Sequence, residues 1–315
     1  MSGLRAAVTG GAGFIGSHLC EALVAEGWDV TALDDLSGGE QRVGFLKEIG
    51  VPLIRTDIRS EEALDAIRDA NPQTIFHLAA QMDVRRSVAD PSFDASVNVL
   101  GTLNILSAAH RSDASCSVIF ASSGGCIYGE PGPEDLPVKE SHVGRPTSPY
   151  GISKKVAEDY LRFYGDAMGV EFASLALANV YGPRQDPHGE AGVVSIFGSR
   201  LNAGEPCVIY GDGKQTRDFV YVGDVARAFV AAAKHRGNET YNIGTGIETS
   251  INDLYETMAK LSEVESPPTY KDARTGELQR SALDHTKATN SLAWTPQTPL
   301  EEGLQKTLDW LKTEA

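Results

Sequence analysis

A glycine-rich turn near the start of the chain constrains the fold more than any other feature of the sequence. The stretch TGGAGFIG, residues 9–16, follows an apolar run at Arg5–Val8 and opens a helical pattern at Phe14–Glu26. It satisfies both the GxGxxG and the GxxGxxG spacing. Glycines here permit a sharp turn, let backbone N–H groups approach a phosphate, and let the helix pack closely on the strand. The turn therefore predicts a nucleotide-binding strand–helix unit.

Short β-type runs alternate with longer helical patterns through the first half of the chain. We expect strands at Arg5–Val8, Val30–Leu33, Leu53–Arg55, Thr74–Leu78, Val118–Ala121 and Phe172–Leu177, and further helices at Glu61–Asp69, Ala95–His110 and Tyr150–Asp166. Such alternation is typical of βαβ units around a parallel sheet. The sequence thus predicts an α/β fold: a doubly wound parallel Rossmann sheet with a smaller C-terminal substrate-binding α/β domain.

The expected domain boundary lies where this alternation ends. After Asn179 the pattern loosens into glycine, proline and charged stretches. We predict an NAD-type nucleotide-binding Rossmann domain over residues 1–178, with a returning segment around 219–245, and a mainly substrate-binding domain over 179–315. No repeat or low-complexity tract marks a flexible linker, so we expect the two parts to pack directly.

The charge balance and the cysteines exclude several classes of function. Twenty-eight basic against forty-three acidic residues give a formal net charge of −15, which repels nucleic acid and anionic membranes. No window approaches the roughly 20 apolar residues of a membrane helix. The four cysteines form no CxxC pair, and no histidine has ligand spacing. We expect a cytoplasmic protein with free thiols, no metal, and neither nucleic acid nor membrane as a partner.

A carboxylate at the end of the second expected strand indicates which dinucleotide binds. Asp34 lies 18 positions beyond Gly16, where it can accept hydrogen bonds from ribose hydroxyls and would repel a 2′-phosphate. NAD is therefore favoured over NADP. Ligands of open parallel sheets bind at the carboxyl ends of the strands. The expected NAD contacts are Gly10, Gly13, Phe14, Ile15, Gly16, Asp34, Asp35, Ser37, Gly38, Asp57, Ile58, Leu78, Ala79 and Ala80.

A tyrosine and a lysine four residues apart form the candidate catalytic pair. Tyr150 and Lys154 follow Pro149 at an expected helix start, so both side chains point the same way. A free phenol has a pKa of about 10, and holding it ionised near pH 7 requires about 4 kcal/mol of differential stabilisation. A neighbouring lysine and a cofactor cation can supply this. Because the chain also carries a dinucleotide-binding glycine motif, we predict that Tyr150 and Lys154 are catalytic residues.

Six stretches carry a resemblance to a known family. TGGAGFIGSHL, HLAAQMDVRRSV, ASSGGCIYG, SPYGISK, NVYGPRQDPHGEAGVV and GDGKQTRDFVYVGDV are together similar to the extended short-chain dehydrogenase/reductases. Within that family the UDP-glucose 4-epimerases are nearest, and the resemblance covers essentially the whole chain. It implies tightly held NAD, a UDP-sugar substrate and a homodimer built from a four-helix bundle.

The resemblance implies a reaction in which oxidation is transient. Tyr150 would take the proton of the sugar 4-hydroxyl as the C4 hydride passes to NAD. The bound 4-keto sugar would then turn over, and hydride would return to its opposite face. Lys154 would lower the pKa of Tyr150 and hydrogen-bond the nicotinamide ribose. Where the family places Ser or Thr, this chain has Gly124, and we assign that catalytic role to Ser123.

The resemblance also implies further site residues. The remaining NAD contacts would be Gln81, Asn98, Ser122, Tyr150 and Lys154. The substrate contacts would be Ser123, Tyr150, Asn179, Gly192, Val193, Val194, Tyr210, Arg217, Arg274 and Glu277. Arginines suit a diphosphate because the planar guanidinium offers paired hydrogen bonds.

Several alternatives stay open on the sequence. The small Ser281, at the family's gating position, leaves UDP-GlcNAc as a second substrate, and Arg184 could receive the carboxylate of UDP-glucuronate. Dehydratases and decarboxylases on this scaffold carry an acidic residue where this chain has Gly-Gly-Cys. Cys126 resembles the catalytic cysteine of GDP-fucose synthase, but that enzyme uses NADPH, and we interpret Cys126 as a packing residue. A non-enzymatic NAD sensor would usually lack the tyrosine or the lysine.

Overall fold

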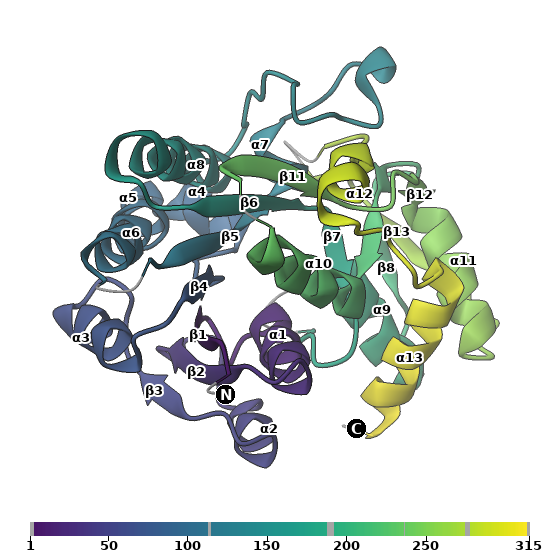
Figure 1. Cartoon of the computed structure of the whole chain (residues 1–315). Coiled ribbons are helices and arrows are strands. Elements are labelled where there is room, and N and C mark those ends of the chain that lie inside the picture. Colours follow the sequence, from purple (N-terminus) through teal and green to yellow (C-terminus); the bar gives the residue numbers. More distant parts are fainter. Residues whose placement is uncertain (1–2, 113–114, 188–191, 236, 275–277, 314–315) are drawn as a thin grey trace.

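A seven-stranded parallel sheet forms the centre of the molecule (Figure 1). The computed structural model describes residues 3–112, 115–187, 192–235, 237–274 and 278–313. The strands are β1 (Arg5–Thr9), β2 (Asp29–Asp34), β3 (Leu53–Arg55), β4 (Thr74–His77), β5 (Ser117–Ser123), β6 (Phe172–Leu177) and β11 (Glu239–Ile243). Their order is β11-β6-β5-β4-β1-β2-β3. Without β11 and taken from the other edge, this order is β3-β2-β1-β4-β5-β6, which is the strand order of dinucleotide-binding doubly wound folds. The predicted fold class is therefore confirmed.

Helices cover both faces of this sheet, as Figure 1 shows. On one face α1 (Phe14–Ala25) packs beside α10 (Val222–Lys234). On the other face lie α3 (Glu61–Ala70), α6 (Thr102–Arg111) and α8 (Pro149–Met168). Because both faces are covered, central strands read as continuous apolar runs, and every residue of β6 is buried.

Local signals set the ends of the predicted helices. Ser148 caps α8 by accepting a hydrogen bond from the Gly151 N–H at 3.1 Å, and Gly169 ends the helix with φ of 73°. The predicted helix at Ala95–His110 is present, but it is not a continuous α-helix. It is split into α5 (Pro91–Ala95), the π-helix η1 (Ser96–Gly101) and α6. Apolar spacing cannot reveal such a π-bulge, because the apolar positions persist through it.

A smaller lobe follows the sheet in the chain. Its helices are α9 (Val193–Asn202), α11 (Ile251–Leu261) and α13 (Leu300–Thr313). Three two-stranded ladders accompany them: β7 (Asn179–Tyr181) with β10 (Phe219–Tyr221), β8 (Val208–Tyr210) with β13 (Thr269–Lys271), and β9 (Thr216–Arg217) with β12 (Thr249–Ser250). The lobe has its own apolar core, which includes Phe197, Leu254, Met258 and Leu308.

The chain returns to the sheet after entering this lobe. Strand β11 pairs with β6 in parallel register, and α10 packs against α1. The segment after α12 (Thr286–Leu292) also joins the sheet core, where the Trp294 indole donates to the Asp224 carbonyl at 2.8 Å. The exact boundary between residues 178 and 179 stays a prediction.

Four short helices complete the fold: α2 (Val43–Glu48), α4 (Val84–Ala89), α7 (Gly124–Ile127) and the 3₁₀ turn η2 (Pro133–Asp135). Within the described ranges, no helix combines the length and apolar character that crossing a membrane requires.

Candidate active site

The glycine turn between β1 and α1 leaves no room for side chains. Gly10 has φ of 70°, and a Cβ there would lie 2.8 Å from the Ala79 backbone nitrogen. A Cβ on Gly16 would overlap the Gly10 carbonyl oxygen. The N-cap of α1 is Gly13, which makes no side-chain cap, so the positive end of the helix is open to an anion. This backbone cradle fits the pyrophosphate of a dinucleotide.

Asp34 ties the end of β2 to the glycine turn. One carboxylate oxygen accepts the Leu36 N–H at 2.8 Å and the other accepts the Ala12 N–H at 3.0 Å. Burial raises the pKa of Asp34. Each carboxylate oxygen can accept a second hydrogen bond, so Asp34 still fits ribose hydroxyls. Asp35 and Ser37 follow directly, with the Ser37 hydroxyl donating to Asp35 at 2.6 Å.

The other predicted contacts on the adenosine side divide into polar and packing residues. The Arg59 guanidinium donates to Asp57 and holds the pKa of that carboxyl below its usual range. Ile58 is buried in the core beneath α6, and its contact with NAD stays a prediction. The backbone N–H of Ala79 donates to the Thr9 hydroxyl at 3.3 Å, which holds the loop after β4 against the turn. A Cβ on Gly38 would meet no other atom within 4 Å.

A buried polar network connects the cofactor side to helix α8. Asn98, on the π-helix, exchanges hydrogen bonds with the Gln81 backbone, both at 2.9 Å. Its amide nitrogen also donates to the Ser153 hydroxyl at 3.2 Å, and Ser153 donates to the Tyr150 carbonyl at 2.9 Å. The π-helix thus turns Asn98 toward the helix that carries the catalytic pair.

Tyr150 and Lys154 lie on one face of α8, as their spacing predicts. The Lys154 ammonium is buried, donates to the Ala121 carbonyl at 2.8 Å and lies 5.9 Å from the centre of the Tyr150 ring. Burial lowers the pKa of Lys154 to about 8. Burial also raises the pKa of the Tyr150 phenol, and a hydrogen bond with Ser123 lowers it. In this arrangement Ser123 is one side chain that favours the ionised phenol.

Packing explains why residue 124 is glycine. A Cβ on Gly124 would overlap the Leu283 side chain and lie 3.2 Å from the Ala176 carbonyl oxygen. A Ser or Thr there would require the end of the Leu283 side chain to shift. Ser123, one residue earlier, is near enough to the Tyr150 phenol and to the Cys126 thiol to lower the pKa of each.

Cys126 is a largely buried thiol close to Ser123, and its interpretation as a packing residue stays a prediction. Its thiol hydrogen-bonds with Ser123, and its pKa is raised by burial while the charges of Arg217 and Lys154 lower it. A thiolate there would also raise the pKa of Tyr150. The sequence signals for this placement were the position of Cys126 one helical turn after Ser123 and its resemblance to the catalytic cysteine of GDP-fucose synthase.

The structure gathers the predicted substrate residues into two groups. In the first, the Asn179 side chain lies beside Gly125, and Arg217 is near enough to Cys126 for its charge to act on the thiol. In the second, the Arg274 guanidinium lies 3.7 Å above the Tyr210 ring centre.

The remaining predicted substrate residues lie at the start of α9 or outside the described part. Gly192 is the N-cap of α9, Val193 is half-buried, and Val194 is buried in the core of the smaller lobe. The Val194 side chain is thus a packing residue. Glu277 lies outside the described residues.

Arg184 is engaged by α1 and α2. Its guanidinium lies 4.0 Å over the Phe45 ring and donates to Glu21 at 2.5 Å. It also contacts the His18 ring. These contacts hold the Arg184 guanidinium against α1 and α2.

The sequence interpretation overlooked a buried carboxylate next to Arg217. Asp218 is fully buried and accepts hydrogen bonds from the N–H groups of Thr245, Gly246 and Leu283. It therefore fixes strand β9 and Leu283 to the returning chain. No motif marks Asp218, because its partners are far away in the sequence.

His77 serves packing. Its ring lies between the hydroxyls of Thr9 and Thr102, at 2.7 and 3.0 Å, and burial lowers its pKa to about 3. Within the described part of the chain, no group of three or more His, Cys, Asp or Glu side chains could hold a metal ion.

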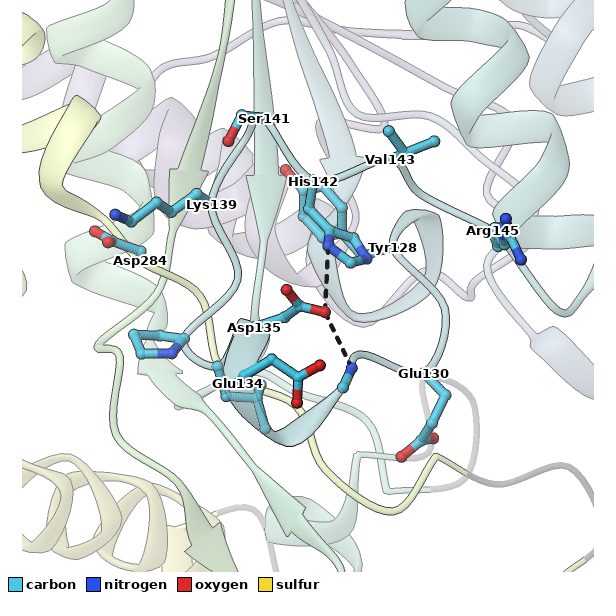
Figure 2. A pocket seen from close by; sticks show the side chains of 13 residues that line it. Tyr128, Glu130, Glu134, Asp135, Lys139, Ser141, His142, Val143, Arg145 and Asp284 are labelled. Atoms are coloured by element: carbon cyan, nitrogen blue, oxygen red, sulfur yellow. Dashed lines mark hydrogen bonds and ion pairs between the residues drawn. The ribbon is translucent and has the colours of Figure 1, made fainter.

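A cavity of about 940 Å³ lies in the loop between α7 and α8. Figure 2 shows the Asp135 carboxylate facing the His142 ring, which is 3.9 Å away. The Tyr128 hydroxyl donates to Asn242 at 2.8 Å behind it. None of the predicted site residues lines this cavity, so it is separate from the group around Tyr150.

A Rossmann sheet with a glycine cradle, whose neighbouring helix carries a tyrosine and a lysine one turn apart, defines a dinucleotide-dependent enzyme of the short-chain dehydrogenase/reductase class. A model of the NAD-dependent epimerase/dehydratase family matches residues 6–244. The chain belongs to that family, and NAD is its cofactor.

Several known proteins are similar to this chain over nearly its full length. The chain is 45% identical over 305 residues to a protein of Methanocaldococcus jannaschii named putative UDP-glucose 4-epimerase, with 97% of each chain covered. It is similar to the crystal structure of the Thermotoga maritima UDP-glucose 4-epimerase with UDP-glucose, at 41% identity and a TM-score of 0.93 over 99% of each chain. The Thermus thermophilus UDP-glucose 4-epimerase in complex with NAD has 40% identity and a TM-score of 0.91, covering 99% of this chain and all of that one.

Proposed function

We propose that this chain is a UDP-glucose 4-epimerase that interconverts UDP-galactose and UDP-glucose. The observation that carries the proposal is the pair on one face of α8, where the buried Lys154 ammonium lies 5.9 Å from the centre of the Tyr150 ring. Relatives that are 40–45% identical over nearly the whole chain carry this name. Bound NAD would supply the acceptor and donor of the C4 hydride, together with a positive nicotinamide charge, and would not be consumed.

The side chains would handle the proton and the phosphates. Tyr150 would accept the proton of the 4-hydroxyl and later return it to the same oxygen, as hydride adds to the opposite face of C4. Ser123 would hydrogen-bond the reacting oxygen and the phenol. The ammonium of Lys154 would favour the phenolate electrostatically, because opposite charges stabilise one another in a site of low polarity. Arg217 would pair with the diphosphate.

The structure also bears on the alternative sugars. Ser281 is buried, so packing already favours a small side chain at this position, in addition to its expected role as a substrate gate. For UDP-glucuronate, binding of the sugar carboxylate to Arg184 would require its ion pair with Glu21 on α1 to open. UDP-GlcNAc remains the second candidate substrate.

Conversion of three substrates tests the proposal. Purified protein, with and without added NAD, is incubated separately with UDP-galactose, UDP-GalNAc and UDP-galacturonate, and the products are separated by chromatography. We expect UDP-glucose from the first and little product from the third. Conversion of UDP-GalNAc alone would establish the N-acetyl alternative, and conversion of none would contradict an epimerase.

We propose that the protein forms a homodimer through α8 and the helices beside it. Several large apolar side chains are exposed there: Val88 at 62%, Leu100 at 58%, Ile152 at 50%, Tyr160 at 37% and Phe163 at 50%. These residues lie on α4, η1 and α8, which pack against one another. Contiguous exposed apolar surface is typical of an interaction site.

A single charged substitution tests the dimer. We expect sedimentation velocity to show a dimer for the unmodified protein and a monomer for Phe163→Glu, because a buried unpaired carboxylate is costly at an apolar interface. Val143→Glu is the matched control, since Val143 is 79% exposed on the loop of the separate cavity. A monomeric unmodified protein, or dissociation by both substitutions, would contradict this interface.

We also propose a cytoplasmic location. All four cysteines are unpaired, which suits a reducing compartment. Burial raises the pKa of Cys20 and of Cys116 to about 12, so these thiols are unreactive.

A further inference from the structure

A buried carboxylate behind the catalytic helix has no part in the chemistry described above. Asp94, on α5, is 1% exposed. One of its oxygens accepts hydrogen bonds from the amide nitrogens of Gln81 at 2.9 Å and Asn98 at 3.1 Å. Its second oxygen has no hydrogen-bond partner among the residues that the structure describes. An unpartnered buried carboxylate oxygen is costly, so its retention requires an explanation.

Asp94 belongs to the network that joins the cofactor side to α8. Its acceptor oxygen orients the amide of Asn98, and that amide also donates to Ser153 at 3.2 Å. Ser153 in turn donates to the Tyr150 carbonyl. The carboxylate is therefore held in a fixed place behind the first turn of α8.

Asp94 lies on α5, which packs against α8, and Asn98 joins it to Ser153, the residue before Lys154, so its negative charge favours the buried ammonium. Lys154 has no carboxylate within ion-pair distance in the described part of the chain, and Ala121 offers it only a neutral carbonyl. Among the surrounding groups, Asp94 from α5 contributes most to raising the pKa of Lys154, followed by Glu158 from α8 and Cys126 from α7. His77 on β4 is neutral, because burial lowers its pKa to about 3.

Glu158 is less able to serve as the counter-charge. Burial raises its own pKa, and one of its oxygens already accepts the Ser174 hydroxyl at 2.8 Å. The negative charge of Asp94 also raises the pKa of the Tyr150 phenol, as does a negative charge on Cys126.

We propose that Asp94 is a positioning residue for the reaction: its negative charge keeps Lys154 protonated, and its bound oxygen fixes Asn98 and Gln81 behind the catalytic helix. This inference rests on the proposed roles of Tyr150 and Lys154 in epimerisation.

The Asp94→Asn substitution separates charge from shape, because asparagine keeps the size and one acceptor oxygen. Activity requires an ionised Tyr150, which sets the acidic limb of the pH profile, and a protonated Lys154, which sets the alkaline limb. Loss of a nearby negative charge lowers both pKa values. We therefore expect both limbs of kcat to move to lower pH by about one pH unit, with KM for UDP-galactose changed less than about twofold.

Asp90→Asn is the matched control. Asp90 is exposed and caps α5 by accepting the Phe93 N–H at 3.0 Å, and asparagine caps equally well. The control removes the same formal charge from the same helix, and we expect its pH profile to match that of the unmodified enzyme. An unshifted profile for Asp94→Asn, or an equal shift for Asp90→Asn, would overturn the proposal.

Thermal unfolding gives a readout that does not depend on activity. Below pH 8 the folded protein holds a charged Lys154, so loss of Asp94 should lower Tm most there, and the deficit should shrink as the pH rises and Lys154 becomes neutral. A deficit that is equal at every pH would show a merely structural carboxylate and overturn the proposal. If the unmodified enzyme converted no sugar nucleotide, the proposed function would fail while this measurement still tested the charge pairing.

If Asp94→Asn does not fold by itself, the substitution is tested in a protein that also carries Lys154→Met. With the ammonium removed, Asp94→Asn should cost little further Tm, and the double variant should fold. An undiminished cost in that background, or an unfolded double variant, would overturn the proposal.

Discussion

Phenylalanine at position 150 is expected to lower kcat for UDP-galactose by about 10³-fold, within the range typical of a lost general acid–base group. The phenol oxygen is the only atom removed, and it is the group that would take the proton from the sugar 4-hydroxyl. Ser123, which hydrogen-bonds with it, cannot replace it, because an aliphatic hydroxyl gives up its proton far less readily than a phenol. Steady-state kinetics on the purified variant give the measurement.

A second tyrosine on the same helix provides the control for this change. Tyr160 lies ten residues further along α8 and is 37% exposed, so Tyr160→Phe also removes one phenol oxygen but none near Ser123. We expect Tyr160→Phe to keep the unmodified kcat and Tm. A Tyr150→Phe enzyme that retained half of its turnover would show that another group moves the proton.

Alanine at position 16 is expected to abolish the copurification of NAD. The new Cβ would overlap the Gly10 carbonyl oxygen, which also accepts the Gly13 N–H at 3.0 Å, so the whole turn must shift. Overpacking of this kind costs about 1–3 kcal/mol of folding stability. It also displaces the backbone N–H groups that would face the pyrophosphate. The measurements are the absorbance of nucleotide released on denaturation and the Tm.

Gly44 supplies a matched glycine for comparison. It lies in α2, where a Cβ would meet no other atom within 4 Å. Gly44→Ala should keep the NAD and gain about 0.4–1 kcal/mol of stability, because alanine restricts the unfolded chain. NAD content in Gly16→Ala equal to that of Gly44→Ala would contradict the assignment of the glycine turn as the pyrophosphate site.

Local sequence patterns determined the backbone of the nucleotide-binding part. The glycine spacing at residues 10–16, the apolar runs of the first six strands and the Pro149–Tyr150 helix start each act within one strand–turn–helix unit. Their physical effects are short-ranged, since they depend on φ angles, side-chain volume and periodicity. The same locality placed Tyr150 and Lys154 on one helix face.

Contacts between distant segments decided the finer chemistry of the site. A Cβ at position 124 would press on the Leu283 side chain, although 159 positions separate Leu283 from Gly124. Glu21 on α1 forms an ion pair with Arg184, which is similarly far away in the sequence. No pattern in one strand or helix contains such information, because it depends on which side chains of other elements fill the same space.

The sequence by itself therefore determined the fold class, the choice of NAD and the Tyr–Lys pair. Only the tertiary structure decided that Cys126 is near enough to Tyr150 to affect its pKa, that Asn98 on a π-helix is buried, and that Asp94 is buried behind α8. The reason is electrostatic as well as steric. The pKa of a buried group depends on its depth and on every nearby charge, and both are fixed only when the helices have packed on the sheet.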